Sequence, residues 1–376
     1  MIPGWTRRKP DEGKKMKAKR LPKERVKEAF AHAEPDRVPI DYLCNPGIDR
    51  RLKAHFGLRS DDDEGLRMAL GVDFRNVAAP FKGPCRFSPV KDRKINEWGI
   101  RTRWIEHASG GYWDYCDFPL KDADLETIRE WPIPEADDYD YEALREACRR
   151  YRDYYLVLGD PGVGDCINST AMLRTMEEVL MDLHDDAEET LTLFDRKLEL
   201  QLKQMERSFE AAEGAIDMLW IGEDLGTQIG PIVGKELFRR HLRPRHQQLV
   251  DLASSYGIPV MIHSCGSSSW AFEDFIEMGI TVIDTLQPEA KKMDPAYLKR
   301  EYGDRLAFHG CISTAGPVVD GTVEETIRDT REKLDILMPG GGYALSPTHQ
   351  LQDNSRTENV VALYETAREY GRYGRR

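Results

Sequence analysis

The segment Val260-Met-Ile-His263-Ser-Cys265-Gly266 carries the residue types and the spacing best suited to chemistry. His263 and Cys265 lie two residues apart at the end of an apolar run, and side chains two apart on a strand point to the same face. Imidazole nitrogen and thiolate sulfur are preferred ligands of zinc. The spacing therefore predicts a zinc site, with a His–Cys pair packed in the core as the alternative.

Other reactive side chains also stand just beyond, or at the end of, short apolar runs. They are Glu223 and Asp224, His309 and Cys311, and His349. These groups could complete a metal site or act as a general acid or base. Each has a structural alternative: helix capping or an ion pair for the two carboxylates, and core packing for His309 and Cys311.

Eight apolar runs have the length of buried strands and are mostly separated by helical segments. They are Val38–Tyr42, Phe74–Ala78, Leu156–Gly159, Ile216–Ile221, Ile258–Ile262, Ile280–Thr285, Leu306–His309 and Tyr343–Leu345. Nearly continuous apolarity indicates burial on both faces, as in a parallel sheet. The pattern predicts an α/β fold, a (β/α)8 barrel, with a doubly wound open sheet as the alternative.

A barrel would bring the candidate groups together, because the carboxyl ends of its strands ring one opening. We therefore expect Glu223, His263, Cys311 and His349 to face a common mouth. Residues 80–150 break the pattern with Trp and Tyr among Gly, Pro and Asp. This stretch reads as an excursion between strands two and three. We expect it to cover the mouth, with an insertion packed on the outside as the alternative.

The remaining organisation is simple. Residues 1–22 form a basic tail without apolar periodicity, and residues 23–376 are expected to form a single barrel domain. Pro244 is expected to kink or split a helix that runs from Lys235 to Tyr256. No internal repeat is visible.

Composition excludes several classes of function. The chain has 54 Lys+Arg and 66 Asp+Glu, a net charge of −12, which disfavours nucleic acid or an anionic membrane as a partner. No apolar run reaches the ~18 residues of a membrane span, and the amino terminus lacks the apolar segment of a secretory signal. Seven scattered cysteines without a CxxC pair suit a reducing compartment. We expect a cytoplasmic globular protein.

Six segments in order resemble the uroporphyrinogen decarboxylase family. They are Glu34-Pro-Asp-Arg-Val-Pro39, Gly222-Glu-Asp-Leu-Gly-Thr-Gln-Ile-Gly-Pro231, His263-Ser-Cys-Gly266, Met338-Pro-Gly-Gly-Gly-Tyr343, Pro347-Thr-His-Gln-Leu-Gln352 and Glu358-Asn-Val-Val-Ala362. The resemblance covers nearly the whole chain after residue 22 and is strongest from about Glu213. It implies a (β/α)8 barrel, in agreement with the strand pattern.

The family contains two chemistries. Its decarboxylases hold the substrate carboxylates with an RQAGR stretch near the amino terminus, where this chain has Asn45-Pro-Gly-Ile-Asp-Arg-Arg51 instead. The other branch contains cobalamin-dependent methyltransferases, including methylcobalamin:coenzyme M methyltransferases and aryl-methyl-ether demethylases. The coenzyme M enzymes bind zinc through a His-x-Cys pair and a later Cys. His263 and Cys265 match the pair, and His349 stands in place of the later Cys.

The resemblance thus implies a zinc-dependent methyltransferase that exchanges a methyl group with a corrinoid protein. It would demethylate a methylated small molecule or methylate a thiol, with His263 and Cys265 as ligands and His349 or Cys311 as the third. Glu223 is a candidate fourth ligand, and Glu223, Asp224 and His349 are candidate catalytic residues.

Methylcobalamin would arrive on the partner, because this chain has no DxHxxG motif. The alternatives are a cofactor-free decarboxylase of uroporphyrinogen or another carboxylated substrate, and a non-catalytic ligand-binding barrel. Assembly as a homodimer is left open.

Overall fold

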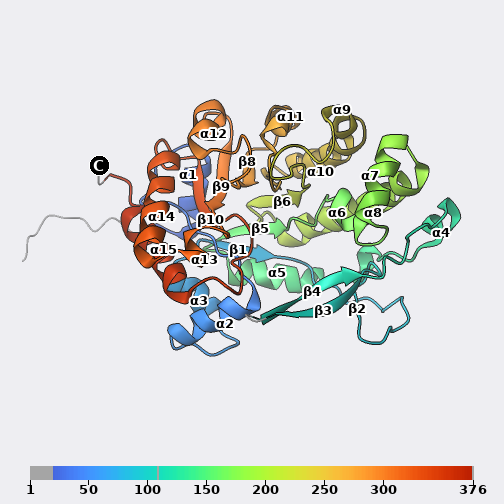
Figure 1. The fold of residues 1–376 in the computed structure, drawn as a ribbon, viewed down its shortest axis with the longest axis horizontal. Helices are drawn as coiled ribbons and strands as arrows, with labels where there is room; N and C mark the ends of the chain where they lie inside the picture. Colours follow the sequence, from blue (N-terminus) through green and yellow to red (C-terminus); the bar gives the residue numbers. More distant parts are fainter. Residues whose placement is uncertain (1–19, 108–109, 375–376) are drawn as a thin grey trace, which may run out of the picture.

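The protein is described by a computed structural model, in residues 20–107 and 110–374. Its main sheet has seven parallel strands in the order β1-β5-β6-β7-β8-β9-β10. Their bounds are Phe74–Val77, Tyr155–Gly159, Met218–Gly222, Val260–His263, Val282–Thr285, Ala307–Ile312 and Tyr343–Pro347. Each strand overlaps one of the predicted apolar runs, and Figure 1 shows the sheet enclosed by helices.

The eighth predicted strand, Val38–Tyr42, is reduced to a short bridging segment that closes the sheet. Ile40 forms a parallel bridge with Leu345 of β10, and the Asp41 N–H donates to the Leu345 carbonyl at 2.8 Å. On its other side the Asp73 N–H, just before β1, donates to the Ile40 carbonyl at 2.8 Å. The segment therefore joins the two edge strands, and the predicted (β/α)8 barrel is confirmed.

Two apolar layers hold the barrel together, because alternate residues of a strand face opposite sides. The interior contains Phe74, Tyr155, Val157, Met218, Trp220, Met261, Val282, Ala307 and Ala344. The intervening residues pack outward against the helices in a much larger core. Burial on both faces explains why the strands read as nearly continuous apolar runs.

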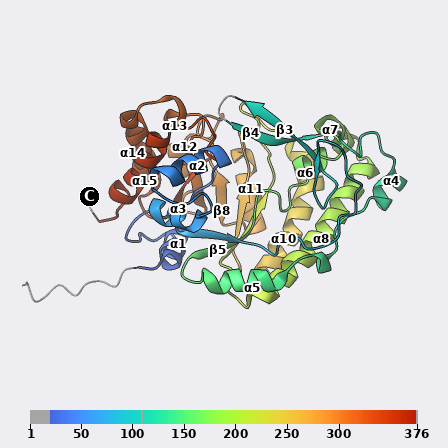
Figure 2. The ribbon, with the colours of Figure 1, turned by 90° about the horizontal axis from the view of Figure 1, so that it is seen from below.

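The helices surround this sheet (Figures 1 and 2). They are α1 (Pro22–Phe30), α2 (Pro46–His55), α3 (Asp63–Leu70), α4 (Leu125–Glu130), α5 (Tyr141–Arg150), α6 (Ile167–Ala171), α7 (Met176–Asp185), α8 (Glu188–Ala212), α9 (Lys235–Leu237), α10 (Arg243–Ser255), α11 (Phe272–Met278), α12 (Pro295–Tyr302), α13 (Pro317–Asp320), α14 (Val323–Leu337) and α15 (Thr357–Tyr370). Short 3-10 turns η1 (Ala136–Asp138) and η3 (Ser269–Ala271) accompany them.

Pro244 splits its helix as predicted. A π-helical turn, η2 (Phe238–Leu242), separates α9 from α10, and Pro244 lies in the first turn of α10. A proline is tolerated there because the first N–H groups of a helix have no intrahelical partner.

The excursion after β1 forms a separate antiparallel sheet of β2 (Lys94–Ile95), β3 (Arg101–His107) and β4 (Gly110–Cys116). It contacts two loops that follow barrel strands at their carboxyl ends. Leu120, which follows β4, donates its N–H to the carbonyl of Leu173, which follows α6, at 2.8 Å. Gly110, at the start of β4, packs against Asp353, which follows β10. Figure 2 shows the β3–β4 hairpin along the outside of the molecule.

Most of the predicted basic tail, residues 1–19, lies outside the described residues. Within the described part of the chain, none of the helices combines the length and apolarity required to cross a bilayer.

Candidate metal site at the carboxyl ends of β6 and β7

Three potential metal ligands converge just beyond β6 and β7. The donor atoms of Asp224, His263 and Cys265 all lie within 4.8 Å of one another. His263 Nε2 is 3.2 Å from Cys265 Sγ and 3.7 Å from Asp224 Oδ1. The convergence follows from the strand register, in which Gly222 at the end of β6 pairs with His263 at the end of β7.

Asp224 is held in place by groups on both sides. Its Oδ1 accepts from the Cys265 N–H at 2.8 Å, and its Oδ2 accepts from Asn168 Nδ2, on α6, at 3.0 Å. The side chain of Asp224 is 28% exposed and that of His263 is 12% exposed. The group is thus largely fixed and remains partly exposed.

His263 is oriented by a buried carboxylate. Asp284, at the end of β8, accepts from His263 Nδ1 at 2.5 Å through one oxygen and from His309 Nδ1 at 2.7 Å through the other. An ionised carboxylate only accepts hydrogen bonds, so both Nδ1 atoms carry protons. This arrangement leaves Nε2 of His263 directed at Asp224 and Cys265, as is usual for a metal-binding histidine.

The electrostatics of these groups follow from burial and pairing. Burial disfavours the charged form of His263, but hydrogen bonds to Asp284 and Cys265 outweigh it and raise the pKa of the imidazole well above its usual value. Burial likewise opposes ionisation of Asp284, but its two histidine partners lower its pKa. For Cys265, burial raises the thiol pKa despite the opposing effect of His263. A bound cation would favour the thiolate, because a metal ligates the deprotonated form.

Glu223 is placed differently from its neighbour Asp224. It is 1% exposed and accepts from the N–H groups of Cys166 and Ile167, at 2.9 and 3.1 Å, at the start of α6. His246 Nε2 is 3.2 Å from its carboxylate and 3.1 Å from the Gly164 carbonyl. Cys166, Glu223 and His246 form a second group with metal-ligand spacing, but all three are buried, whereas Asp224, His263 and Cys265 are each partly exposed. Through its bonds to the Cys166 and Ile167 N–H groups, Glu223 anchors α6.

Cys311 does not face the mouth, which corrects the expectation from sequence. Its side chain is fully buried in the outer core, where burial raises the thiol pKa to about 12 and the charged groups that act on it include Lys333 and Asp329 of α14. The reason is local backbone geometry. Gly310 and Cys311 have φ of 124° and 74°, so the alternation of the strand breaks after His309 and the thiol turns outward.

His349 does not join His263 and Cys265 either. The preceding residue is fixed, because the Thr348 N–H donates to the Ile312 carbonyl at 2.8 Å and Thr285 Oγ1 donates to the Thr348 carbonyl. His349 is then exposed, with Nδ1 3.4 Å from Gln352 Nε2. In the ranges 20–107 and 110–374, the third group at the His263–Cys265 pair is Asp224.

The donor set fits zinc. One imidazole nitrogen, one sulfur and one carboxylate oxygen are all ordinary zinc ligands, and three protein ligands leave a fourth position for substrate. Asp284 supplies the outer carboxylate that typically orients a zinc-bound histidine. Sequence reasoning missed this residue, although it stands at the carboxyl end of a predicted strand, where Glu223 and His263 were noticed.

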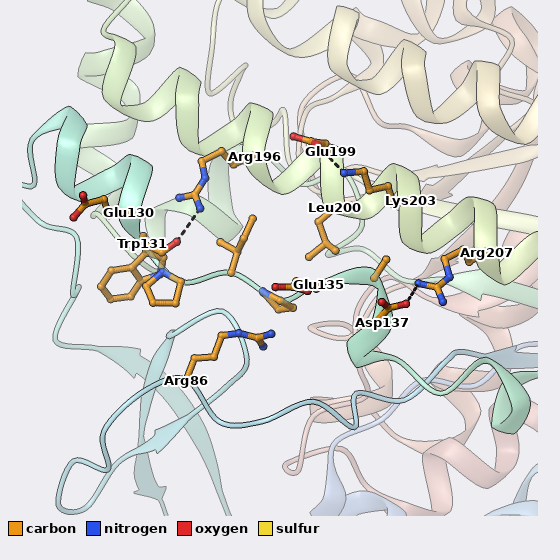
Figure 3. Close-up of a pocket in the computed structure, with 14 residues that line it drawn as sticks. Arg86, Glu130, Trp131, Glu135, Asp137, Arg196, Glu199, Leu200, Lys203 and Arg207 are labelled. Carbon is orange, nitrogen blue, oxygen red and sulfur yellow. Dashed lines mark hydrogen bonds and ion pairs between the residues drawn. The ribbon is translucent and has the colours of Figure 1, made fainter.

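A large groove lies elsewhere, between the excursion and α8 (Figure 3). It has a volume of about 720 Å³ and is lined by residues such as Trp131, Arg196 and Arg207. Arg207 pairs with Asp137 at 2.6 Å, and Arg196 donates to the Trp131 carbonyl at 2.9 Å. Neither the metal-site residues nor their partners line it, so this groove is separate from the candidate site.

The comparisons with known proteins agree with the fold. Residues 123–370 match the uroporphyrinogen decarboxylase (URO-D) family, so the chain belongs to that family. No match is found among curated proteins.

Among solved structures, the chain is similar to a methyltransferase from Methanosarcina mazei, with a TM-score of 0.66 and 16% identity over 94% of this chain and 99% of that one. At this identity the likeness shows the fold. A psychrophilic family 10 endo-β-1,4-xylanase (TM-score 0.37, 8% identity, 65% of this chain and 86% of that one) and a D-psicose 3-epimerase (0.32, 12%, 65% and 85%) are more distant.

Proposed function

We propose that this protein is a zinc-dependent methyltransferase that exchanges a methyl group with a corrinoid protein, methylating a small thiol or demethylating a methylated small molecule. The observation that carries the proposal is the convergence of Asp224, His263 and Cys265 at the barrel mouth. Membership of the URO-D family and similarity to a protein described as a methyltransferase support it.

Each residue has a role that its contacts allow. His263 would ligate through Nε2, because Asp284 accepts the proton on Nδ1. Cys265 would ligate as thiolate and Asp224 through Oδ1, which already lies next to the Cys265 N–H. Zinc in this site would lower the pKa of a bound thiol, so that a thiolate is available at neutral pH.

The amino-terminal region supports methyl transfer over decarboxylation of uroporphyrinogen. Arg51 lies roughly where the decarboxylases carry their arginine-rich stretch. Here its guanidinium donates to the carbonyls of Asp353 and Ser355, at 2.8 and 2.7 Å. These contacts tie Arg51 to the loop after β10, and the chain lacks the arginine-rich stretch itself.

Methyl transfer can be tested with free methylcobalamin as the donor and a panel of small thiols, including 2-mercaptoethanesulfonate and cysteine, as acceptors. We expect loss of the methylcobalamin spectrum and formation of the methyl thioether, both dependent on zinc. Cys265→Ser should abolish turnover, and Cys311→Ser, which alters a thiol buried behind the barrel wall, should retain it. Equal rates for the two variants would refute the proposed site.

A further inference from the structure

The hydrogen bonds around Asp284 continue through His309 to a second carboxylate, that of Asp41. His309 Nε2 is 3.2 Å from Asp41 Oδ2, and the other oxygen of Asp41 accepts from the Tyr42 N–H at 2.7 Å. The four groups therefore form one chain, His263–Asp284–His309–Asp41, which ends on the backbone of the barrel-closing segment.

The strand register explains why these side chains are neighbours. His263 pairs with Asp284 across β7 and β8, and Asp284 pairs with His309 across β8 and β9. Residues paired in register on neighbouring strands point to the same side of the sheet. Three neighbouring strands thus place a histidine, a carboxylate and a histidine side by side in the interior.

We propose that His309 and Asp41 are positioning residues of the metal site, which act through Asp284 to hold His263 with Nε2 directed at Asp224 and Cys265. This inference rests on the proposed metal site. Neither His309 nor Asp41 would touch the metal or the substrate.

The packing supports a positioning role. His309 is fully buried, and its ring lies 5.4 Å from that of Phe74 and 6.2 Å from that of Trp220, measured between centroids. The imidazole therefore has little freedom to turn, and its Nδ1–H fixes one oxygen of Asp284. If that donor were lost, the Asp284 carboxylate could rotate, and His263 would lose the fixed acceptor that sets its orientation.

Two substitutions of His309 separate the hydrogen bond from the bulk of the ring. His309→Leu removes both hydrogen bonds. His309→Asn retains an amide donor near the position of Nδ1 but loses the link to Asp41. Loss of an outer-shell partner typically weakens metal affinity by about 10–100-fold. His309 bonds to such a partner, Asp284, and not to a ligand itself. We therefore expect a loss of up to that size in zinc affinity for the Leu variant, measured by competition with a chromophoric chelator, and partial rescue by Asn.

The matched control is His246→Leu. It removes an equally buried imidazole from the cluster around Glu223, and we expect its zinc affinity to equal that of the wild type. A folded His309→Leu protein with wild-type zinc affinity would overturn the inference while the proposed function stands. If His309→Leu does not fold, Asp41→Asn carries the test, with a smaller but measurable loss expected and an unchanged affinity as the refuting result.

A measurement on the metal-free protein distinguishes failure of the positioning role of His309 from failure of the proposed function. In crystals of zinc-free His309→Leu, the contact between His263 Nδ1 and Asp284 Oδ2, which is 2.5 Å here, should lengthen or break. If wild-type protein binds no zinc, the proposed function fails, and this contact still decides whether His309 positions His263. An unchanged contact would refute the positioning role.

Discussion

The buried His309 makes the stability of the metal-free protein depend on pH in a way that can be calculated. Burial disfavours its charged form, but hydrogen bonds to Asp284 and Asp41 outweigh this and raise its pKa from 6.5 to about 9. When a pKa is raised by folding, the stabilisation is fully present below the unfolded value and is lost as the pH rises through the folded value. The difference corresponds to about 3 kcal/mol of unfolding free energy, lost mainly between pH 6.5 and 9.

His309→Asn isolates this contribution. The substitution also changes packing and hydrogen bonding at every pH. The slope of stability against pH between 6 and 9.5 therefore reports the titration of His309, together with any change that its loss causes in His263, which shares Asp284 with it. Urea unfolding at pH 6 and at pH 9.5, with chelator present, should show that the wild type loses about 3 kcal/mol more than the variant. Parallel pH profiles would show that His309 does not carry a stabilising charge and would refute the reasoning.

Three further predictions concern neighbouring residues and the alternative activity. Glu223→Gln should lower the unfolding free energy by about 1–3 kcal/mol, because a buried backbone N–H of α6 loses its acceptor. The zinc stoichiometry should be retained. Loss of zinc with unchanged stability would make Glu223 a ligand instead. Cys311 should react with a thiol reagent only on unfolding, since its pKa is raised to about 12 and its side chain is buried; rapid modification of the native protein at this position, identified by mass spectrometry, would contradict its placement. Purified protein should not convert uroporphyrinogen to coproporphyrinogen in an anaerobic assay, because the chain has Asn45-Pro-Gly-Ile-Asp-Arg-Arg51 in place of the RQAGR stretch of the decarboxylases. Sustained decarboxylation would restore the alternative function.

Apolar periodicity was enough to predict the barrel. Strands buried on both faces leave a nearly continuous apolar signature, and seven of the eight predicted runs coincide with strands. The eighth, Val38–Tyr42, forms only a short bridge. Its two neighbours still bond to it, so the sheet closes as predicted although the segment is hardly a strand.

The site could be predicted only in part. The two-residue spacing of His263 and Cys265 predicted that both side chains lie on one side, and their separation of 3.2 Å between Nε2 and Sγ agrees, although Cys265 lies beyond the end of β7. The same spacing failed for His309 and Cys311, because positive φ angles at Gly310 and Cys311 break the alternation. A pattern of residue types does not report such a local change in the backbone.

Asp224 and Asp284 show a different limit of sequence reasoning. Which of two adjacent carboxylates joins His263 and Cys265 depends on how the loop leaves β6. Glu223 accepts from the backbone at the start of α6, and Asp224 accepts from the Cys265 N–H just beyond β7. The position of Asp284 between His263 and His309 depends on the register between β7, β8 and β9. Both facts concern neighbours that are distant in sequence, so they became visible only in the folded chain.

The most direct test of the central claim is the zinc content of protein purified without chelator, compared across matched variants. The wild type should hold about one zinc per chain, and Cys265→Ser and Asp224→Asn should lose most of it. Cys311→Ser and His349→Ala, which alter the two residues that the sequence offered as ligands, should keep it. Full zinc in Cys265→Ser, or loss of zinc in His349→Ala or Cys311→Ser but not in Asp224→Asn, would contradict a metal site formed by Asp224, His263 and Cys265.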